Sequence, residues 1–133
     1  MNTTSEPRSA TPTPRVELVD NWHARWPLVL RLFDRLGQRK VLRLDEDGWL
    51  SARQSVLVAF IESKPAGYLC FHIHPKDHQH IEARLDAVGF ASEQVSEYLA
   101  DALRQAAVHH ALDLNCSSFI GFEPRKRKGG ASA

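Results

Sequence analysis

The chain has 133 residues, 43% of them hydrophobic, and a formal net charge of +1 at pH 7. This length fits one domain with a modest core, and the near-neutral charge gives no long-range attraction to nucleic acid or membranes. No apolar run approaches the ~18 residues of a membrane span. Residues 1–15 are rich in Thr, Ser and Pro and lack the apolar core of a secretory signal. We therefore expect a disordered leader and, by default, a cytoplasmic protein.

The first half of the chain predicts a strand, a helix and an irregular connection. Residues 16–19 are short and apolar, as in a strand. Apolar residues then recur at four-residue spacing over 28–36, and a proline in the first turn favours a helix that begins near Trp26. Gly37 is a typical residue for the end of that helix. Residues 45–48, Asp-Glu-Asp-Gly, indicate a turn or a short helix start, without the later ligands of a calcium loop.

Three consecutive antiparallel strands are expected next, over 56–61, 68–74 and 80–88. The first is a continuous apolar run, and 64–67 has the composition of a turn. The other two alternate between faces. One face is apolar and comprises Leu69, Phe71, Ile73, Ile81, Ala83, Leu85 and Ala87. The opposite face comprises Tyr68, Cys70, His72, His74, His80, Glu82, Arg84 and Asp86.

The pairing of the last two of these strands depends on the turn between them. A hairpin closed over 75–79 would place His74 opposite His80 and His72 opposite Glu82. A slip of two residues would keep both faces and change every pair. The sequence leaves these registers open.

A second helix and a last strand complete the predicted domain over 16–122. The helix is expected to start after Ser92, a good N-cap, and to end near His110. Its apolar stripe comprises Val95, Leu99, Leu103 and Ala106. Residues 114–122 read as a strand that returns parallel to the previous one. The order β-α-(α)-β-β-β-α-β predicts an α/β (α+β) fold with a mixed, mostly antiparallel sheet and flanking helices.

The two cysteines and the C-terminal segment narrow the chemistry. Cys70 and Cys116 lie in apolar runs without CxxC spacing, which predicts two buried, reduced thiols and no zinc site or disulfide. Residues 123–133 form a basic segment that we expect to be a flexible tail. No aromatic residue interleaves its charges, which disfavours nucleic-acid binding.

Four histidines fall within residues 72–80, and three interpretations of this stretch stay open. His72, His74 and His80 could share a metal ion, although no nearby cysteine supports it and we predict no metal. Glu82, Asp86 or His72 could act in acid–base catalysis. The commonest interpretation of such a pattern is a solvated polar sheet face with cross-strand pairs.

Several segments carry a resemblance to a known family. Residues 57–69, LVAFIESKPAGYL, are similar to the second and third strands of the GNAT superfamily of N-acetyltransferases, and 85–88, LDAV, sits where that family has its fourth strand. The helix after Ser92 lies where the family's coenzyme A-binding helix begins. The resemblance covers 16–122. It implies acetyl-CoA-dependent acyl transfer to an amine, with Glu82, Asp86 or His72 as the catalytic acid–base group.

The resemblance also implies which residues contact the coenzyme, and it carries two departures. The implied contacts are Ala87, Val88, Ser92, Gln94, Val95 and Ser96. The family's glycine-rich loop, whose N–H groups hold the pyrophosphate, is replaced here by a run without glycine between residues 90 and 99 that carries Glu93 and Glu97. The later helix and its general-acid tyrosine are missing, since Tyr68 and Tyr98 lie elsewhere.

These departures predict a truncated family member with weak coenzyme binding, of order 0.1–1 mM. The alternative function is a non-catalytic GNAT-like module that binds or regulates a protein. The shortened sheet edge predicts a homodimer at high concentration. The sequence does not identify the amine or the protein partner.

Overall fold

The structure, a computed structural model, describes residues 13–122. Its elements, in chain order, are β1 (Arg15–Val19), α1 (Trp26–Arg35), the 3-10 helix η2 (Arg39–Val41), β2 (Gln54–Ile61), β3 (Lys64–Pro75), β4 (Ile81–Phe90), α2 (Glu93–Asp113) and β5 (Ser118–Ile120). The sheet order is β1-β2-β3-β4-β5, with β4 and β5 parallel and the other neighbours antiparallel. The predicted order and α/β class are confirmed. Arg15, assigned to the leader, begins β1, while residues 1–12 and the predicted tail lie outside the described residues.

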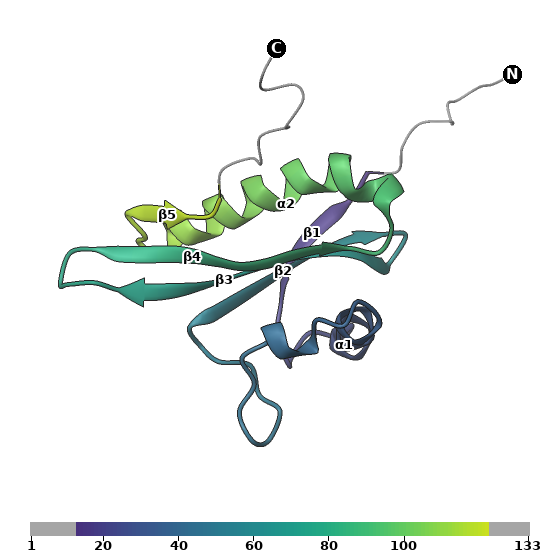
Figure 1. Ribbon diagram of the computed structural model, residues 1–133, viewed down its shortest axis with the longest axis horizontal. Coiled ribbons are helices and arrows are strands. Elements are labelled where there is room, and N and C mark those ends of the chain that lie inside the picture. Colours follow the sequence, from purple (N-terminus) through teal and green to yellow (C-terminus); the bar gives the residue numbers. More distant parts are fainter. Residues whose placement is uncertain (1–12, 123–133) are drawn as a thin grey trace, which may run out of the picture.

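The two helices cover opposite faces of the sheet, so the molecule has three layers (Figure 1). Under α2, Leu99 and Leu103 pack with Leu69 and Phe71. Under α1, the buried cluster includes Val29, Phe33, Val56, Val58, Tyr68 and Cys70. Each such apolar side chain contributes roughly 1.5–3 kcal/mol on burial. The alternation predicted for 68–71 is confirmed, since successive residues face different helices.

Both helices begin where the sequence predicts and one ends later. Trp26 starts α1, and Gly37, at φ +68°, follows its last turn with its N–H donating to the Asp34 carbonyl. Ser92 is the N-cap residue of α2, but its side chain makes no capping hydrogen bond. The predicted end of α2 at His110 is wrong, because the buried alanine at 111 extends the apolar stripe by another turn.

The turn between β2 and β3 lies earlier than predicted. Ile61 pairs with Lys64, and the two residues between them, Glu62 and Ser63, have φ of 52° and 70°. This is the left-handed geometry of a two-residue hairpin turn, which is usually made by Asn or Gly. Residues 64–67 therefore belong to β3, and a bulge opposite Ala59 and Phe60 accommodates the proline there.

Of the registers that the sequence left open between β3 and β4, the structure has the one slipped by two residues from the hairpin closed over 75–79. His74 lies opposite Glu82 and His72 lies opposite Arg84. The loop that sets this register is closed by the Lys76 N–H, which donates to the His80 carbonyl. An Asp77 carboxylate oxygen, which accepts the Gln79 N–H at 2.8 Å, braces the loop from inside.

A β-bulge at Asp86 changes the face on which β4 presents its later residues. Phe71 pairs with Leu85 and Cys70 pairs with Ala87, so Asp86 has no partner of its own. Ala87 consequently packs on the α1 side. The predicted placement of Ala87 with Leu85 on one face is wrong, because an extra residue shifts the two-residue period.

The last strand is shorter than predicted. Only Ser118–Ile120 is strand, and Gly121 follows at φ +87°. Between α2 and β5, Cys116 is buried, as is Cys70 in β3, and both thiols are free. Within residues 13–122, neither helix has the length and apolar character needed to cross a bilayer.

Candidate functional site

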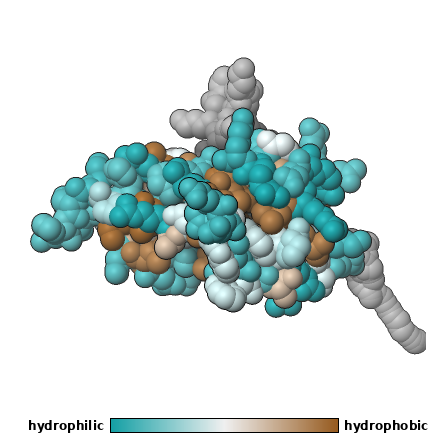
Figure 2. Space-filling view, turned by 90° about the horizontal axis from the view of Figure 1, so that it is seen from below, coloured by the Kyte–Doolittle hydropathy of each residue, from teal (hydrophilic) through white to brown (hydrophobic). Residues whose placement is uncertain are grey.

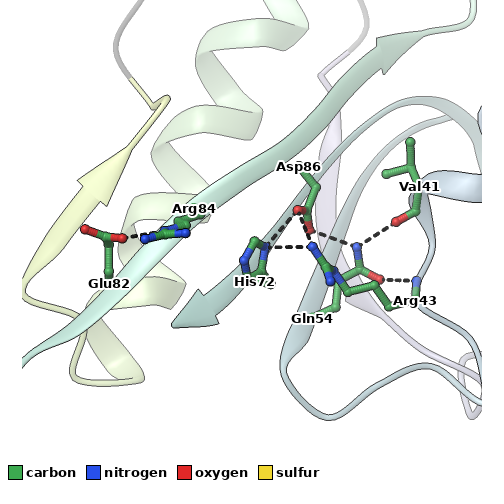
Figure 3. Close-up of polar contacts among 7 residues, drawn as sticks. All are labelled: Val41, Arg43, Gln54, His72, Glu82, Arg84 and Asp86. Carbon is green, nitrogen blue, oxygen red and sulfur yellow. Dashed lines mark hydrogen bonds and ion pairs between the residues drawn. The ribbon is translucent and has the colours of Figure 1, made fainter. Parts of the chain in front are cut away.

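The bulge on β4 brings two predicted acid–base residues into contact. His72 comes from β3 and Asp86 from β4, and the two side chains point toward one another (Figure 3). The His72 Nδ1 atom lies 2.8 Å from Asp86 Oδ1. The side chains are 20% and 11% exposed, respectively. This partial burial strengthens the contact relative to one in bulk water while it leaves the imidazole reachable from solvent.

Gln54, at the start of β2, holds the carboxylate from the other side. Its Nε2 atom donates to Asp86 Oδ2 at 3.0 Å and to the Val41 carbonyl at 3.0 Å. Its Oε1 atom accepts the Arg43 backbone N–H at 2.7 Å. Gln54 is only 4% exposed. One buried amide therefore fixes both the carboxylate and the segment that follows η2.

Arg43 supplies a cation to the same carboxylate and helps to assign the histidine tautomer. Its Nη2 atom donates to Asp86 Oδ1 at 3.2 Å and lies 3.3 Å from His72 Nδ1. Because a carboxylate oxygen only accepts, the 2.8 Å contact requires the proton on Nδ1. The approach of Arg43 to Nδ1 is then a contact between two donors.

This tautomer leaves His72 Nε2 with a free lone pair. No hydrogen-bond partner for Nε2 occurs among the described residues, 13–122. A histidine whose Nδ1–H is held by a carboxylate can take up a proton at Nε2, and the carboxylate then stabilises the imidazolium. The arrangement is that of an oriented general base.

Glu82, the third predicted catalytic residue, lies away from this pair. Figure 3 shows it bound to Arg84 on the same strand and separate from the His72–Asp86 contact. Lys76 Nζ is a second cation at 3.6 Å. The hydrogen bond from Arg84 lowers the pKa of Glu82 below its ordinary value. Glu82 is thus held as a carboxylate between two cations, an arrangement that opposes proton uptake.

The remaining histidines of the stretch are not gathered with His72. His80 Nδ1 lies 2.8 Å from Asp77 Oδ1 within the exposed hairpin loop. Within residues 13–122, no three metal-ligating side chains come together.

The coenzyme-binding residues implied by the resemblance lie along the second half of β4 and the start of α2. β5 pairs with β4 only from Glu82 to Arg84. Beyond that point, the β5-side edge of β4 has no strand neighbour among the described residues. An unpaired edge offers backbone N–H and C=O groups to an extended ligand with amide groups.

A hollow of about 430 Å³ lies at the far end of this edge, where β4 leads into α2. Of the implied contacts, Val88, Ser92 and Ser96 line it. Ala87 packs toward α1, and Val95 packs toward the core under α2. Gln94 is exposed and does not line the hollow.

The start of α2 has backbone N–H groups that no N-cap side chain satisfies. Because Ser92 makes no side-chain capping bond, the first-turn N–H groups are not capped by it. Against this, Glu93 lines the same hollow and brings a negative charge. The preceding Gly89 is required by packing, since a Cβ there would collide with the Tyr68 ring. The unpaired edge, the hollow and the helix start fit an acyl-coenzyme A, and Glu93 is the feature that opposes it.

Sequence reasoning missed two members of the site, Gln54 and Arg43. A detectable signal existed for Gln54, because a polar residue directly before a buried apolar strand is unusual and must be hydrogen-bonded. Arg43 gave no signal, since it lies in an irregular segment. Only the folded structure places it beside residues about 30 to 40 positions away.

Comparisons with known proteins identify the fold. No family model matches the sequence, and no curated protein matches it. Among solved structures, a ribosomal-protein-alanine N-acetyltransferase from Brucella melitensis is similar over 88% of this chain and 86% of its own, with a TM-score of 0.62 at 14% identity. An aminoglycoside acetyltransferase from an uncultured soil metagenomic sample, in complex with sisomicin, matches 90% of this chain and 81% of its own, with a TM-score of 0.63 at 13% identity.

Two further similar structures are also acetyltransferases. An acetyltransferase of Trypanosoma brucei is similar over 86% of this chain and 96% of its own, with a TM-score of 0.58 at 15% identity. A GNAT family acetyltransferase from Staphylococcus aureus gives 0.61 at 14% identity, over 86% and 95% of the two chains. The chain therefore has the fold of the GNAT acetyltransferases, as its resemblance implied.

Proposed function

We propose that this protein is an acyl-coenzyme A-dependent N-acyltransferase in which His72 acts as the general base. One observation carries the proposal. The oriented His72–Asp86 pair lies at the bulge of β4, just beyond the point where that strand loses its neighbour β5. A proton acceptor and an open strand edge thus occur at the same place.

Different residues of the chain would bind the cofactor, accept the proton and position the base. When bound, acetyl-CoA supplies an activated thioester carbonyl. The β4 edge beyond Arg84, with Val88, Ser92 and Ser96, would hold it. His72 Nε2 would take the proton that the acceptor amine loses as its nitrogen bonds to the acyl carbon, and the coenzyme A sulfur would leave with the electron pair of the broken C–S bond. Asp86 fixes the ring and stabilises its cation, and Gln54 and Arg43 position Asp86.

The acceptor is proposed only as an amine. The similar structures include proteins named for acetylating a ribosomal-protein alanine and aminoglycosides, and one is a complex of an aminoglycoside N-acetyltransferase with CoA. At 9–15% identity these names do not transfer an acceptor to this chain.

A non-catalytic GNAT-like module is the second candidate. It is favoured by the start of α2, where Glu93 lines the hollow and no glycine follows Gly89 before the helix. Such a chain would keep the fold and bind a protein or regulate one without turnover.

A titration with acetyl-CoA separates the two candidates. Backbone amide signals of residues 87–98 are followed by NMR, and acetyl transfer to a panel of a polyamine, an aminoglycoside and a peptide with a free N-terminus is measured alongside. The proposal expects saturable shifts with a dissociation constant of order 0.1–1 mM, and acetylated product that is lost in His72→Gln. Saturable shifts without product on any amine favour the module, and the absence of shifts at millimolar acetyl-CoA excludes the enzyme.

A further inference from the structure

A second groove lies between α1 and the β2–β3 hairpin. It has a volume of about 620 Å³. Its apolar lining comprises Leu28, Leu32, Ile61, Pro65, Ala66 and Ala91. Figure 2, viewed onto the side of the molecule that carries α1, shows apolar areas interrupted by hydrophilic ones. An apolar floor of this kind suits a flat, partly apolar group such as a nucleobase.

Three cations surround this floor. Arg31 and Arg35 come from α1, one helical turn apart, and Lys64 comes from the start of β3. None of the three has an ion-pair partner among residues 13–122. The one nearby carboxylate of α1, Asp34, binds Arg39 instead, at 3.0 Å. Glu62 is the one acidic residue among those that line the groove.

Unpaired cations at this spacing favour an anionic ligand. Like charges four residues apart on a helix destabilise it slightly, and an anion between them removes that cost. Guanidinium groups also match phosphate oxygens in geometry, because they can donate two parallel hydrogen bonds. A groove with an apolar floor, two guanidinium groups and one ammonium group has the chemistry of a phosphorylated nucleotide site.

The groove adjoins the hollow at the start of α2. Ala91 lines both, and its N–H donates to the Ala66 carbonyl at 2.8 Å, so the end of β4 is tied to the groove floor. The stretch from Asp86 to Ala91 spans roughly 16 Å of strand. This length is comparable to an extended pantetheine arm, so a ligand whose reacting end lies near His72 could reach the groove with its other end.

We propose that this groove binds the phosphorylated nucleotide end of the acyl-coenzyme A required by the proposed function, with Arg31, Arg35 and Lys64 contacting its phosphates. The inference rests on that proposed function. Glu93 places a negative charge at the start of α2, which opposes phosphate binding there. The cations on α1 would supply the positive charge that the helix start lacks.

Calorimetry with 3′,5′-ADP, the nucleotide fragment without the arm, tests the groove directly and needs no turnover. The variant Arg31→Gln/Arg35→Gln is compared with Lys40→Gln/Arg53→Gln, which removes the same charge from exposed positions outside the groove. We expect the groove variant to weaken 3′,5′-ADP and coenzyme A by about tenfold or more, since charge-assisted contacts are lost. The control variant should bind as the unaltered protein does. In the unaltered protein, 3′,5′-ADP should shift the amide signals of Ala66 and Ala91.

Several results would contradict the proposal that this groove binds the nucleotide end of coenzyme A. Unchanged coenzyme A binding in the groove variant would do so while leaving the acyltransferase proposal intact. Equal weakening in both variants would show an effect of net charge alone. Inorganic phosphate binding as tightly as 3′,5′-ADP would show a plain anion site without nucleotide recognition. If neither coenzyme A nor 3′,5′-ADP binds the unaltered protein, the groove and the acyltransferase proposal fail together.

Discussion

Two acidic side chains on β4, four residues apart, have opposite surroundings. Glu82 lies near the hairpin end, opposite His74, and is bound by Arg84 and Lys76. Asp86 lies at the bulge and is bound by His72, Arg43 and Gln54. The sequence presents the two residues as equivalent members of one alternating face.

The difference between them comes from the bulge. Regular pairing would continue the register in which His72 lies opposite Arg84, and Asp86 would then lie opposite Cys70. The extra residue moves that place to Ala87 and leaves the Asp86 carboxylate beside the imidazole. Both acids contact permanent cations, but Asp86 also contacts a histidine and can stabilise the imidazolium that forms when the ring takes up a proton, whereas Glu82 is bound by Arg84 and Lys76.

Replacement of the histidine should have the largest effect. We expect His72→Gln to lower kcat/KM for acetyl transfer by about 100-fold or more, because general-base catalysis is worth that much. Glu82→Gln should stay within about threefold if it has no part in proton transfer. Single-turnover rates of acetyl transfer to the same amine, measured for both variants and the unaltered protein, check the role. Equal losses in both variants would contradict the distinction between the two acids.

Asp86→Asn should have the next largest effect. The amide can still occupy the space but no longer stabilises the imidazolium, so we expect a loss of roughly 10- to 100-fold in kcat. Substrate KM values should change little, because Asp86 is argued to act through His72. A rise in KM with unchanged kcat would place Asp86 in substrate binding instead.

Gln54→Ala tests whether the buried Gln54 amide holds the Asp86 carboxylate in place. The substitution leaves Asp86 Oδ2, the Val41 carbonyl and the Arg43 N–H without a buried partner. We expect a loss of about 2–3 kcal/mol in the free energy of unfolding, measured with urea. Gln105→Ala, an exposed glutamine on α2, is the matched control and should change it by less than about 0.5 kcal/mol. A comparable loss in both variants would show that Gln54 has no special role.

The sequence predicted the order of elements because hydrophobic period and turn composition carry that information. The starts of α1 and α2 were correct, since Pro27 and Ser92 are local signals. The turn at Glu62 and Ser63 was missed because neither residue is typical of left-handed geometry. Propensity favoured the Pro and Gly that follow, which instead occupy a strand.

The site could be predicted only in part. His72 and Asp86 were among the candidates, but their contact depends on a bulge that no residue type in 80–88 indicates. The register was left open because several turn lengths satisfy the same alternation. Arg43 and Gln54 reach Asp86 across 43 and 32 positions, and such long-range contacts are set by the packed sheet.

The smallest effect concerns Glu82 and the dependence of stability on pH. Arg84 lowers the pKa of Glu82 in the folded protein relative to its ordinary value of 4.5. A carboxyl with a lowered folded pKa contributes stability above its unfolded pKa and loses it as the pH falls through the folded value. The contribution of Glu82 should thus be complete at neutral pH and should fade below about pH 4.5. Because Glu82→Gln removes this titration, its Tm should fall less than that of the unaltered protein between about pH 6 and pH 3.

Glu46→Gln is the control for this measurement, since Glu46 lies exposed in the loop before β2. Its Tm should follow that of the unaltered protein across the same range. The His72–Asp86 pair stays intact in both variants, so acetyl transfer at neutral pH should also remain near its starting rate. If Glu82→Gln steepened the fall of Tm with acid, Glu82 would be a group whose protonation is favoured by folding. Glu82 would then be a candidate proton donor, because an acid that gains a proton on folding has one to give. It would no longer be a charged structural group.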